Sequence, residues 1–481
     1  MKNIIKLILL PCAVFFLASC EKNLEEVNID PNNSPTANDS QVLSSALASL
    51  GYLVDVDWNS QSFLWAQYYT WGIGVSIGNQ ERFVATPDDY DNGWARAYSQ
   101  CLADLKFLTK SESAAYRGVG KLLTAYIFQG LVDHFGDIPY SEALNGEIEE
   151  GSVLTPKFDG AASIYGNLVT LVDDGISEFE NAPNDIGADD YVFAGDLSKW
   201  AKFGNSLKLK LLMRTSETDP KSAEVVKLIS DGNFISALSD IAAVPFSGET
   251  GSQNPQYARF EFGVGDFYFP SNATVNVLTD LNDPRLTAFY DPATIGPFAN
   301  QIRGINQGTI DSVEFTADAA EFGSSSAYAT SDNNPVVLIS PWEVWFLRAE
   351  AAARYGTADN DADAFGEAIT SNFEYIGLGG ADSYISSLNY GGSLDEKLNK
   401  IGIQKWISLN GTQEDEGWIE TRRFDRPNNR IFTEGIFQTP PLSVLPAGTF
   451  PASWLYPASE KSLNPNAPAQ RSITDRLFWD N

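Results

Sequence analysis

Apolar side chains recur at spacings of three and four residues along much of this chain of 481 residues. That spacing puts them on one face of an α-helix and therefore predicts amphipathic helices. The first apolar stripe begins after Ser40 and consists of Val42, Leu43, Ala46, Leu47 and Leu50. The same periodicity predicts helices over residues 87–108, 113–135, 160–179, 197–213, 221–229, 340–355 and 361–375, and two more between 393 and 423.

Capping signals mark the ends of several of these helices. Thr86-Pro87-Asp88-Asp89 and Ser340-Pro341-Trp342-Glu343 each combine a hydroxyl N-cap, a proline at the first helical position and an acidic residue at N3. Asp196 is a further candidate N-cap, and Gly136 and Gly356 are expected to end the helices that precede them.

Residues 58–71 are unusually aromatic, with Trp58, Phe63, Trp65, Tyr68, Tyr69 and Trp71. Trp58 and Trp65 lie seven residues apart on one helical face, which predicts packing in the core. Trp71 lies where this helix is expected to give way to a glycine-rich loop, so we expect its ring to be more exposed. Asn79 and Arg82 share that loop. An exposed indole can stack on the apolar face of a sugar ring or on a peptide group while amide and guanidinium groups hydrogen-bond the rim.

Two regions lack a sustained helical period. Residues 246–334 are dense in Gly, Asn, Pro and Asp, which predicts loops and short strands. Residues 426–481 form a proline-rich tail with little regular structure expected. The sequence therefore predicts a mostly α fold in one domain over residues 40–481. Its helical body covers 40–245 and 335–425, with a loop-rich insert at 246–334 and an irregular tail. Helix pairs closed by short turns suggest tetratricopeptide-like hairpins.

The N-terminus has the pattern of a secretory signal. Lys2 and Lys6 precede an apolar run from Leu7 to Leu17 that is too short to span a bilayer as a helix. The run ends in Leu17-Ala18-Ser19-Cys20, which resembles the lipobox of bacterial lipoproteins. We therefore expect residues 1–19 to be removed, Cys20 to be acylated and residues 20–39 to form an extended tether. The alternative is an ordinary secreted protein cleaved near Ala18.

The charge balance excludes several classes of partner. The chain has 32 basic and 63 acidic residues, and removal of Lys2 and Lys6 leaves a net charge of 30 − 63 = −33. Phosphate backbones and anionic lipid surfaces attract Lys and Arg, so neither nucleic acid nor an anionic membrane surface is expected to bind. No run of eighteen apolar residues follows Cys20, which leaves the lipid anchor as the expected membrane attachment.

The chain offers few residues for catalysis or metal binding. Cys101 would remain as an unpaired, buried thiol, and His134 is the only histidine, for which a structural role is favoured. No phosphate-binding loop, GxSxG elbow or HExxH pair is present. The carboxylate pairs Glu149-Glu150 and Asp189-Asp190 fit a solvated surface, and the oxygen-rich stretch 184–190 departs from calcium-loop spacing. We predict no cofactor, no metal and no catalytic residues.

Several short stretches together resemble the SusD/RagB family of outer-membrane nutrient-binding lipoproteins, in its SusD-like branch. One departure is Ala452-Ser453-Trp454, where relatives often carry arginine. The matching stretches are residues 135–143 (FGDIPYSEA), 199–209 (KWAKFGNSLKL), 282–286 (NDPRL), 347–351 (LRAEA), 404–409 (QKWISL) and 455–460 (LYPASE), followed by Asn464.

The resemblance implies tetratricopeptide-like hairpins with an irregular region laid against them. It also implies a partner, a SusC-like TonB-dependent barrel, over which the lipoprotein acts as a lid. Such proteins capture oligosaccharides, or peptides in some branches, and transfer them unchanged. Family ligands lie near the loop before residue 87 and in the irregular insert. On that basis the candidate ligand-binding residues are Trp71, Asn79, Arg82, Tyr268 and Tyr328.

Three alternatives stay open at this stage. The ligand is a peptide instead of a glycan, the protein is a surface glycoside hydrolase, or it is a purely structural lipoprotein that bridges partners. A hydrolase requires two carboxyl groups facing one another across a cleft, at a separation of about 5 to 10 Å.

Overall fold

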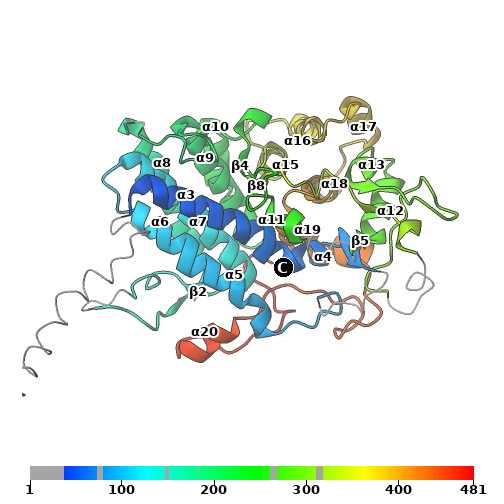
Figure 1. Ribbon diagram of the computed structural model, residues 1–481. Helices are drawn as coiled ribbons and strands as arrows, with labels where there is room; N and C mark the ends of the chain where they lie inside the picture. Colours follow the sequence, from blue (N-terminus) through cyan, green and yellow to red (C-terminus); the bar gives the residue numbers. More distant parts are fainter. Residues whose placement is uncertain are drawn as a thin grey trace, which may run out of the picture.

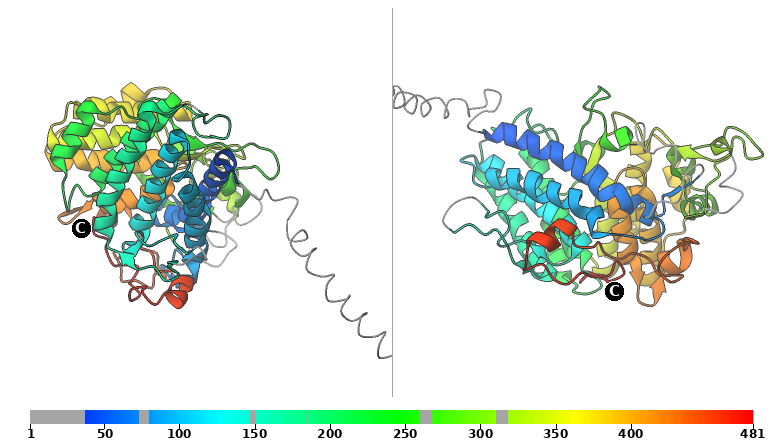
Figure 2. Two further views of the ribbon diagram at one scale, coloured as in Figure 1. Left: turned by 90° about the vertical axis from the view of Figure 1, so that its left-hand side faces the viewer. Right: turned by 60° about the horizontal axis from the view of Figure 1, so that its bottom comes forward.

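Helices build most of the molecule, and many of them lie side by side in antiparallel pairs (Figures 1 and 2). The computed structural model describes residues 37–72, 80–146, 151–183, 185–259, 268–309 and 318–480. Loops and short strands of the insert and the tail pack against the helices at one end and along the lower edge of Figure 1. The mostly α fold with a packed irregular region, expected from the sequence, is confirmed.

The first helical run comprises α3 (Asp39–Tyr52), a π-helical turn η1 (Leu53–Trp58) and α4 (Asn59–Trp65). The side chain of Asn38 caps α3 by accepting a hydrogen bond from the backbone N–H of Gln41 at 2.9 Å. Trp58 and Trp65 are buried, as predicted from their shared helical face.

The aromatic segment does not stay helical to Trp71, so that prediction is wrong. The helix ends at Trp65, Gln67 takes a positive φ of 57°, and residues Tyr69–Trp71 form strand β1. A left-handed backbone at a non-glycine residue cannot continue a right-handed helix, and it redirects the chain into the strand.

The second helical run is η2 (Pro87–Tyr90), α5 (Asp91–Ala95), the π-helical turn η3 (Arg96–Cys101) and α6 (Leu102–Leu108). The predicted capping box at its start is confirmed, because the Thr86 and Asp89 side chains satisfy each other's backbone N–H groups. Cys101 is buried as predicted, and burial raises the pKa of its thiol to about 12.

The predicted helices after it are confirmed as α7 (Ala114–Phe135), α8 (Ala161–Glu178), α9 (Leu197–Arg214) and α10 (Ser222–Asp231). Helix α7 packs against α8, and α8 packs against α9. The α7–α8 contact is close at Gly175, where an added Cβ would lie 3.0 Å from Leu122 and 3.2 Å from the carbonyl oxygen of Gly118. Glycine lets the two backbones approach here.

The second half of the body contains α15 (Pro341–Tyr355), α16 (Asp361–Ile376), α17 (Ala381–Ser387), α18 (Leu394–Leu409) and α19 (Glu414–Phe424). Helices α15 and α16 form the predicted hairpin, and α18 and α19 form another. At the start of α15, Ser340 accepts from the backbone N–H of Glu343 at 3.2 Å. The Glu343 side chain does not complete the predicted capping box; it binds Lys210 at 2.9 Å.

Buried ion pairs join these helices in the middle of the molecule. Arg214 of α9 binds Asp133 of α7 at 3.2 Å and Glu416 of α19 at 2.7 Å, and it also binds Glu420. Arg423 of α19 binds Glu420 of the same helix and Glu350 of α15, each at 2.6 Å. Buried charges are tolerated when they are paired in this way, and breaking one pair leaves its partner uncompensated.

The insert is richer in helix than the sequence indicated. It contains α11 (Pro255–Arg259), α12 (Asn272–Asp280), α13 (Leu286–Phe289) and the 3-10 turn η8 (Ala319–Glu321). Helix α12 was missed because polar Asn and Thr side chains interrupt its apolar period over only nine residues. Ser271 caps it by accepting from the backbone N–H of Ala273.

The described strands are short and pair antiparallel in twos. The pairs are β1 with β5 (Tyr268–Pro270), β2 (Ile138–Pro139) with β3 (Phe158–Asp159), β4 (Ala242–Val244) with β8 (Val336–Ile339), β6 (Tyr290–Asp291) with β7 (Ser324–Ser325), and β9 (Asp425–Arg426) with β10 (Asn429–Arg430). Short 3-10 or π turns are η4 (Phe179–Asn181), η5 (Leu238–Asp240) and η9 (Phe432–Ile436), and α20 spans Ala458–Leu463.

The C-terminal tail contributes large side chains to the core. Trp454, Tyr456 and Trp479 are all buried, although the chain around them is irregular. The Trp454 ring stacks on His134 at 4.0 Å, and His134 Nε2 lies 2.8 Å from a carboxylate oxygen of Asp415. His134 therefore has the structural role that the sequence favoured. No helix among the described residues is long and apolar enough to cross a bilayer.

Candidate functional site

Strand β1 pairs with strand β5 close to α4, whose positions Figure 1 labels, and the aromatic side chains of Trp71 and Tyr268 lie in contact on these two strands. The strands pair with Trp71 opposite Tyr268, and the two ring centroids are 4.6 Å apart with planes inclined at 51°. Tyr268 is buried and its ring meets the edge of Phe63 at 5.0 Å, whereas Trp71 is half-buried. The pair therefore presents one supported indole at the surface.

Gly72, which follows Trp71, is tightly packed against side chains of the insert. A Cβ at Gly72 would collide with the ring of Phe269 and would lie 2.8 Å from the side chain of Ile305. Only glycine fits between these side chains, so the chain leaves β1 close to the insert. This close approach helps to hold β1 against β5.

Glu81 and Arg82 follow Trp71 in the chain. The backbone oxygen of Arg82 accepts from the N–H of Val444 at 2.9 Å. Its side chain is half-buried, and its Nε has no hydrogen-bond partner within the described parts of the chain. Glu81 is only 1% exposed and accepts from the backbone N–H of Trp71 at 2.9 Å. Burial raises the pKa of Glu81 to about 8.

The structure brings two of the candidate residues, Trp71 and Tyr268, into contact, and places Arg82 in the turn that follows. Tyr328 lies apart from this pair: its ring stacks on Phe289 at 5.4 Å and meets Tyr375 of α16 edge-on at 6.2 Å. Asn79 and Cys20 lie outside the described residues. Sequence reasoning missed Glu81 and Gln307, whose buried side chains hydrogen-bond the backbone of β1.

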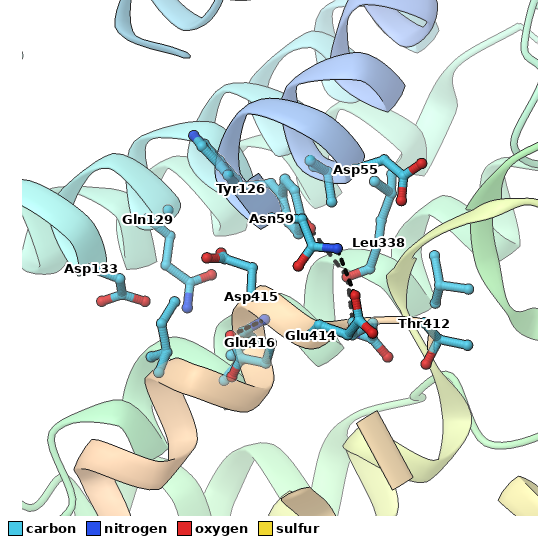
Figure 3. Close-up of a pocket in the computed structure, with 17 residues that line it drawn as sticks. Asp55, Asn59, Tyr126, Gln129, Asp133, Leu338, Thr412, Glu414, Asp415 and Glu416 are labelled. Atoms are coloured by element: carbon cyan, nitrogen blue, oxygen red, sulfur yellow. Dashed lines mark hydrogen bonds and ion pairs between the residues drawn. The ribbon is translucent and has the colours of Figure 1, made fainter. Parts of the chain in front are cut away.

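A separate, interior cavity of about 40 Å³ lies between α4, α7 and α19 (Figure 3). The amide of Asn59 points toward Glu414 and donates to it at 2.7 Å, and it also donates to Gln256 at 2.6 Å. Asp55 accepts from the backbone N–H of Gln256 at 2.9 Å. Burial raises the pKa of Asp55 to about 7 and also raises the pKa of Glu414.

This cavity has the size of a water site. A water needs about 10 to 15 Å³ of such volume, so a sugar ring does not fit. Its remaining carboxylates are held by protein groups: Asp415 by Ser62 at 2.6 Å, and Glu416 by Lys210 at 2.9 Å. No group of three or more His, Cys, Asp or Glu side chains that could hold a metal ion occurs within the described ranges.

The family motifs of the sequence map largely onto the interior. Arg285 of the NDPRL stretch binds Asp283 at 2.6 Å and Gln404 of the QKWISL stretch at 2.5 Å, with all three side chains buried. Glu350 of the LRAEA stretch binds Arg423 as described above, and Lys405 of the QKWISL stretch binds Glu420 at 2.9 Å. These motifs therefore hold helices together and do not form the candidate ligand surface.

The comparisons with known proteins agree with this fold. Residues 31–436 match the SusD-like_2 family, which is described as "Starch-binding associating with outer membrane". No curated protein sequence matches the chain.

Several solved structures share the fold at low sequence identity. One described as a chitin-binding protein is 22% identical, with a TM-score of 0.76 over 92% of this chain and 100% of that one. A chitin-binding SusD homologue from Flavobacterium johnsoniae is 19% identical, with a TM-score of 0.75 over 91% of this chain and 98% of its own. A SusD-like protein from Bacteroides thetaiotaomicron is 20% identical, with a TM-score of 0.76 over 92% and 99%.

These likenesses establish the fold, and the family match covers most of the chain, including the stretches quoted from the sequence up to residue 409. The chain therefore belongs to the SusD-like family of starch-binding proteins that associate with the outer membrane.

Proposed function

We propose that this protein is a surface lipoprotein that binds nutrient oligosaccharides and delivers them, chemically unchanged, to a SusC-like TonB-dependent transporter in the outer membrane. The family description supports a glycan ligand and the outer membrane as location. Two proteins of similar fold that are described as chitin-binding support the same ligand class. The signal over residues 1–19 and acylation at Cys20 would supply the membrane attachment.

The half-buried indole of Trp71, supported by Tyr268, is the observation that carries this proposal. A sugar ring has apolar C–H faces that stack on such an indole. Because the ring is already held by its neighbour, little side-chain freedom is lost when a ligand binds. The half-buried side chain of Arg82 belongs to the turn at residues 80–83.

The arrangement of the acidic groups around the interior cavity supports binding without conversion. Protein groups engage each carboxylate that lines the interior cavity, and the cavity has no room for a sugar ring. A glycoside hydrolase needs two carboxyl groups free to face a glycosidic bond. These contacts favour a binding protein over a hydrolase.

Calorimetric titration of the chain from residue 21 onward with maltohexaose and chitohexaose tests the proposal. Replacing Trp71→Ala removes the stacking surface and is expected to weaken binding by about tenfold or more, the effect of a binding hot spot. The measurement is the dissociation constant for whichever oligosaccharide binds.

Trp345→Ala is the matched control. Trp345 is also a half-buried indole, but it lies on α15, where its Nε1 donates to the backbone oxygen of Ser236 at 3.0 Å. It is expected to leave the dissociation constant unchanged. An equal loss of affinity in both variants would contradict the assignment of the site. Binding of peptides with no binding of glycans would favour a peptide-capturing member of the family.

A further inference from the structure

Within the described segments, strand β1 has a partner strand on one side only. It pairs with β5, and on its other side the backbone N–H of Trp71 donates to the Glu81 carboxyl at 2.9 Å. The outward N–H groups of an edge strand need acceptors. Glu81 supplies one from a buried position, in the place where a further strand would otherwise lie.

Glu81 is itself held by a buried amide. The Nε2 of Gln307 donates to its other carboxyl oxygen at 2.6 Å and also contacts the backbone oxygens of Tyr69 at 3.2 Å and Leu64 at 3.3 Å. Gln307 and Glu81 are 2% and 1% exposed, so water does not compete for these bonds. One glutamine thus ties the end of α4, strand β1 and Glu81 together.

A second pair of amides continues this network toward the tail. The backbone N–H of Gln307 donates to the side chain of Gln438 at 3.0 Å. The side chain of Gln67 donates to the backbone oxygen of Gln438 and accepts from the backbone N–H of Gln438, each at 2.8 Å. Gln67 is the residue with positive φ that ends the α4 region and starts β1. The network therefore fixes both ends of the short strand.

We propose that Glu81 is a positioning residue for the glycan site, which sets the backbone of Trp71 and thereby the indole against Tyr268, and that its protonation state regulates the site. The regulatory part rests on the role of Trp71 given under the proposed function. Glu81 is 1% exposed and is not itself expected to contact the ligand.

Burial favours the protonated acid of Glu81 and outweighs the hydrogen bonds that it accepts, which favour the ionised form. Among the described residues, no basic side chain forms an ion pair with it, and its hydrogen bonds come from neutral groups on β1 and the 305–309 turn. Arg82 follows it in the chain, and Tyr268 of β5 faces it with Arg259 at 3.5 Å from the tyrosine hydroxyl. Burial raises the pKa of Tyr268 above its usual value, so Tyr268 titrates at higher pH than Glu81.

The direction of the pH effect follows from the raised pKa of Glu81. The pKa of a carboxyl group is raised when the group is buried, as Glu81 is against the Trp71 backbone. The protonated acid therefore favours the buried position, and this advantage is lost as pH rises through the raised pKa. The pKa of Glu81 is about 8. Above that pH we expect the ionised carboxylate to leave the pocket and the Trp71 indole to become more exposed.

Tryptophan fluorescence of the chain from residue 21 onward tests this without any ligand. The chain has 11 Trp residues, so the Trp71 signal is the difference between the protein and its Trp71→Phe variant. Between pH 6 and 9.5 this signal is expected to shift to longer wavelength with a midpoint near pH 8. Glu81→Gln, which mimics the protonated acid, is expected to keep the pH 6 signal throughout.

Asp55→Asn is the matched control, because Asp55 is another buried carboxyl with a raised pKa but lines the interior cavity. It is expected to leave the Trp71 titration in place. Glu81→Leu removes the acceptor and is expected to give the high-pH signal at every pH while the urea midpoint shows that the chain stays folded. A titration that persists in Glu81→Gln, or that Asp55→Asn abolishes, would overturn the proposal.

Binding of maltohexaose and chitohexaose gives the second readout. The bound sugar is expected to be held about tenfold more weakly at pH 9 than at pH 6, equivalent to one hydrogen bond to a buried group. Glu81→Gln is expected to remove this difference. Binding that is equally pH-dependent in Glu81→Gln overturns the regulatory role. If neither sugar binds at any pH, the proposed function fails, and the fluorescence titration still decides whether Glu81 positions Trp71.

Discussion

Arg285 shows how single residues of the family motifs stabilise the fold. Its side chain is fully buried and donates to Asp283, Gln404, Asn372 and Ser408 at 2.5 to 3.0 Å. Burial alone would raise the pKa of Asp283, but the Arg285 guanidinium outweighs it and holds that pKa below its usual range. The pair therefore stabilises the fold above the pKa of the unfolded acid, and this contribution is lost as pH falls through the lowered value.

Replacing Arg285→Met is expected to lower the free energy of unfolding by about 3 to 5 kcal/mol at pH 7, because Asp283 is left as an uncompensated buried charge. Urea denaturation measures this loss. Lys227→Met is the control: it removes an exposed ion pair with Asp231, and the midpoint is expected to stay nearly unchanged. A similar midpoint for both variants would show that the buried pair contributes nothing.

Helix α9 depends on its N-cap at the scale of the element. The Asp196 side chain accepts from the backbone N–H groups of Ser198 at 3.0 Å and Lys199 at 3.3 Å. Hydrogen bonds, chiefly from Ser198, lower the pKa of Asp196. The charged cap therefore stabilises α9 above the pKa of the unfolded acid and ceases to do so as pH falls through the lowered value.

Asp196→Ala is expected to cost about 1 kcal/mol of folding free energy, the usual effect of losing an N-cap. Asp196→Asn keeps an acceptor oxygen and is expected to retain most of the stability while losing the acid dependence. The midpoints of thermal unfolding of the unsubstituted protein and the two variants, measured at pH 7 and pH 3, give the comparison. If the Ala and Asn variants are equally destabilised, the hydrogen bonds do not provide the capping energy.

Helices were predictable from sequence where local signals agree. The apolar period that predicts α7 is within the helix itself, and Ser340, which predicts the start of α15, is the residue just before that helix. The end of the aromatic helix was not predictable, because it depends on the positive φ of Gln67, whose side chain is held by the backbone of Gln438 from far along the chain. Helix α12 was missed since nine residues with polar interruptions show too little period.

The candidate site was only partly predictable for the same reason. Trp71 stood out because the aromatic helix was expected to give way there to a glycine-rich loop, and Tyr268 was named from the family resemblance. Their contact requires β1 and β5, which are some 200 residues apart in sequence, to pair in one register. Glu81 and Gln307 gave no local signal, because their roles exist only when three segments meet.

The whole molecule combines a rigid helical body with one supported aromatic surface. Buried ion pairs join α7, α9, α15 and α19, while the insert and the tail complete the support of β1. The strongly acidic composition repels anionic polymers. A scaffold of this kind can hold a ligand surface in place without supplying chemistry.

Equilibrium dialysis of the chain from residue 21 onward against maltohexaose and chitohexaose, followed by chromatography of the recovered sugar, measures binding and conversion together. We predict saturable binding of at least one of the two oligosaccharides, with the sugar recovered at its original length after prolonged incubation. Failure to bind either one, or recovery of shorter products, would contradict a glycan-binding protein that leaves its ligand unchanged.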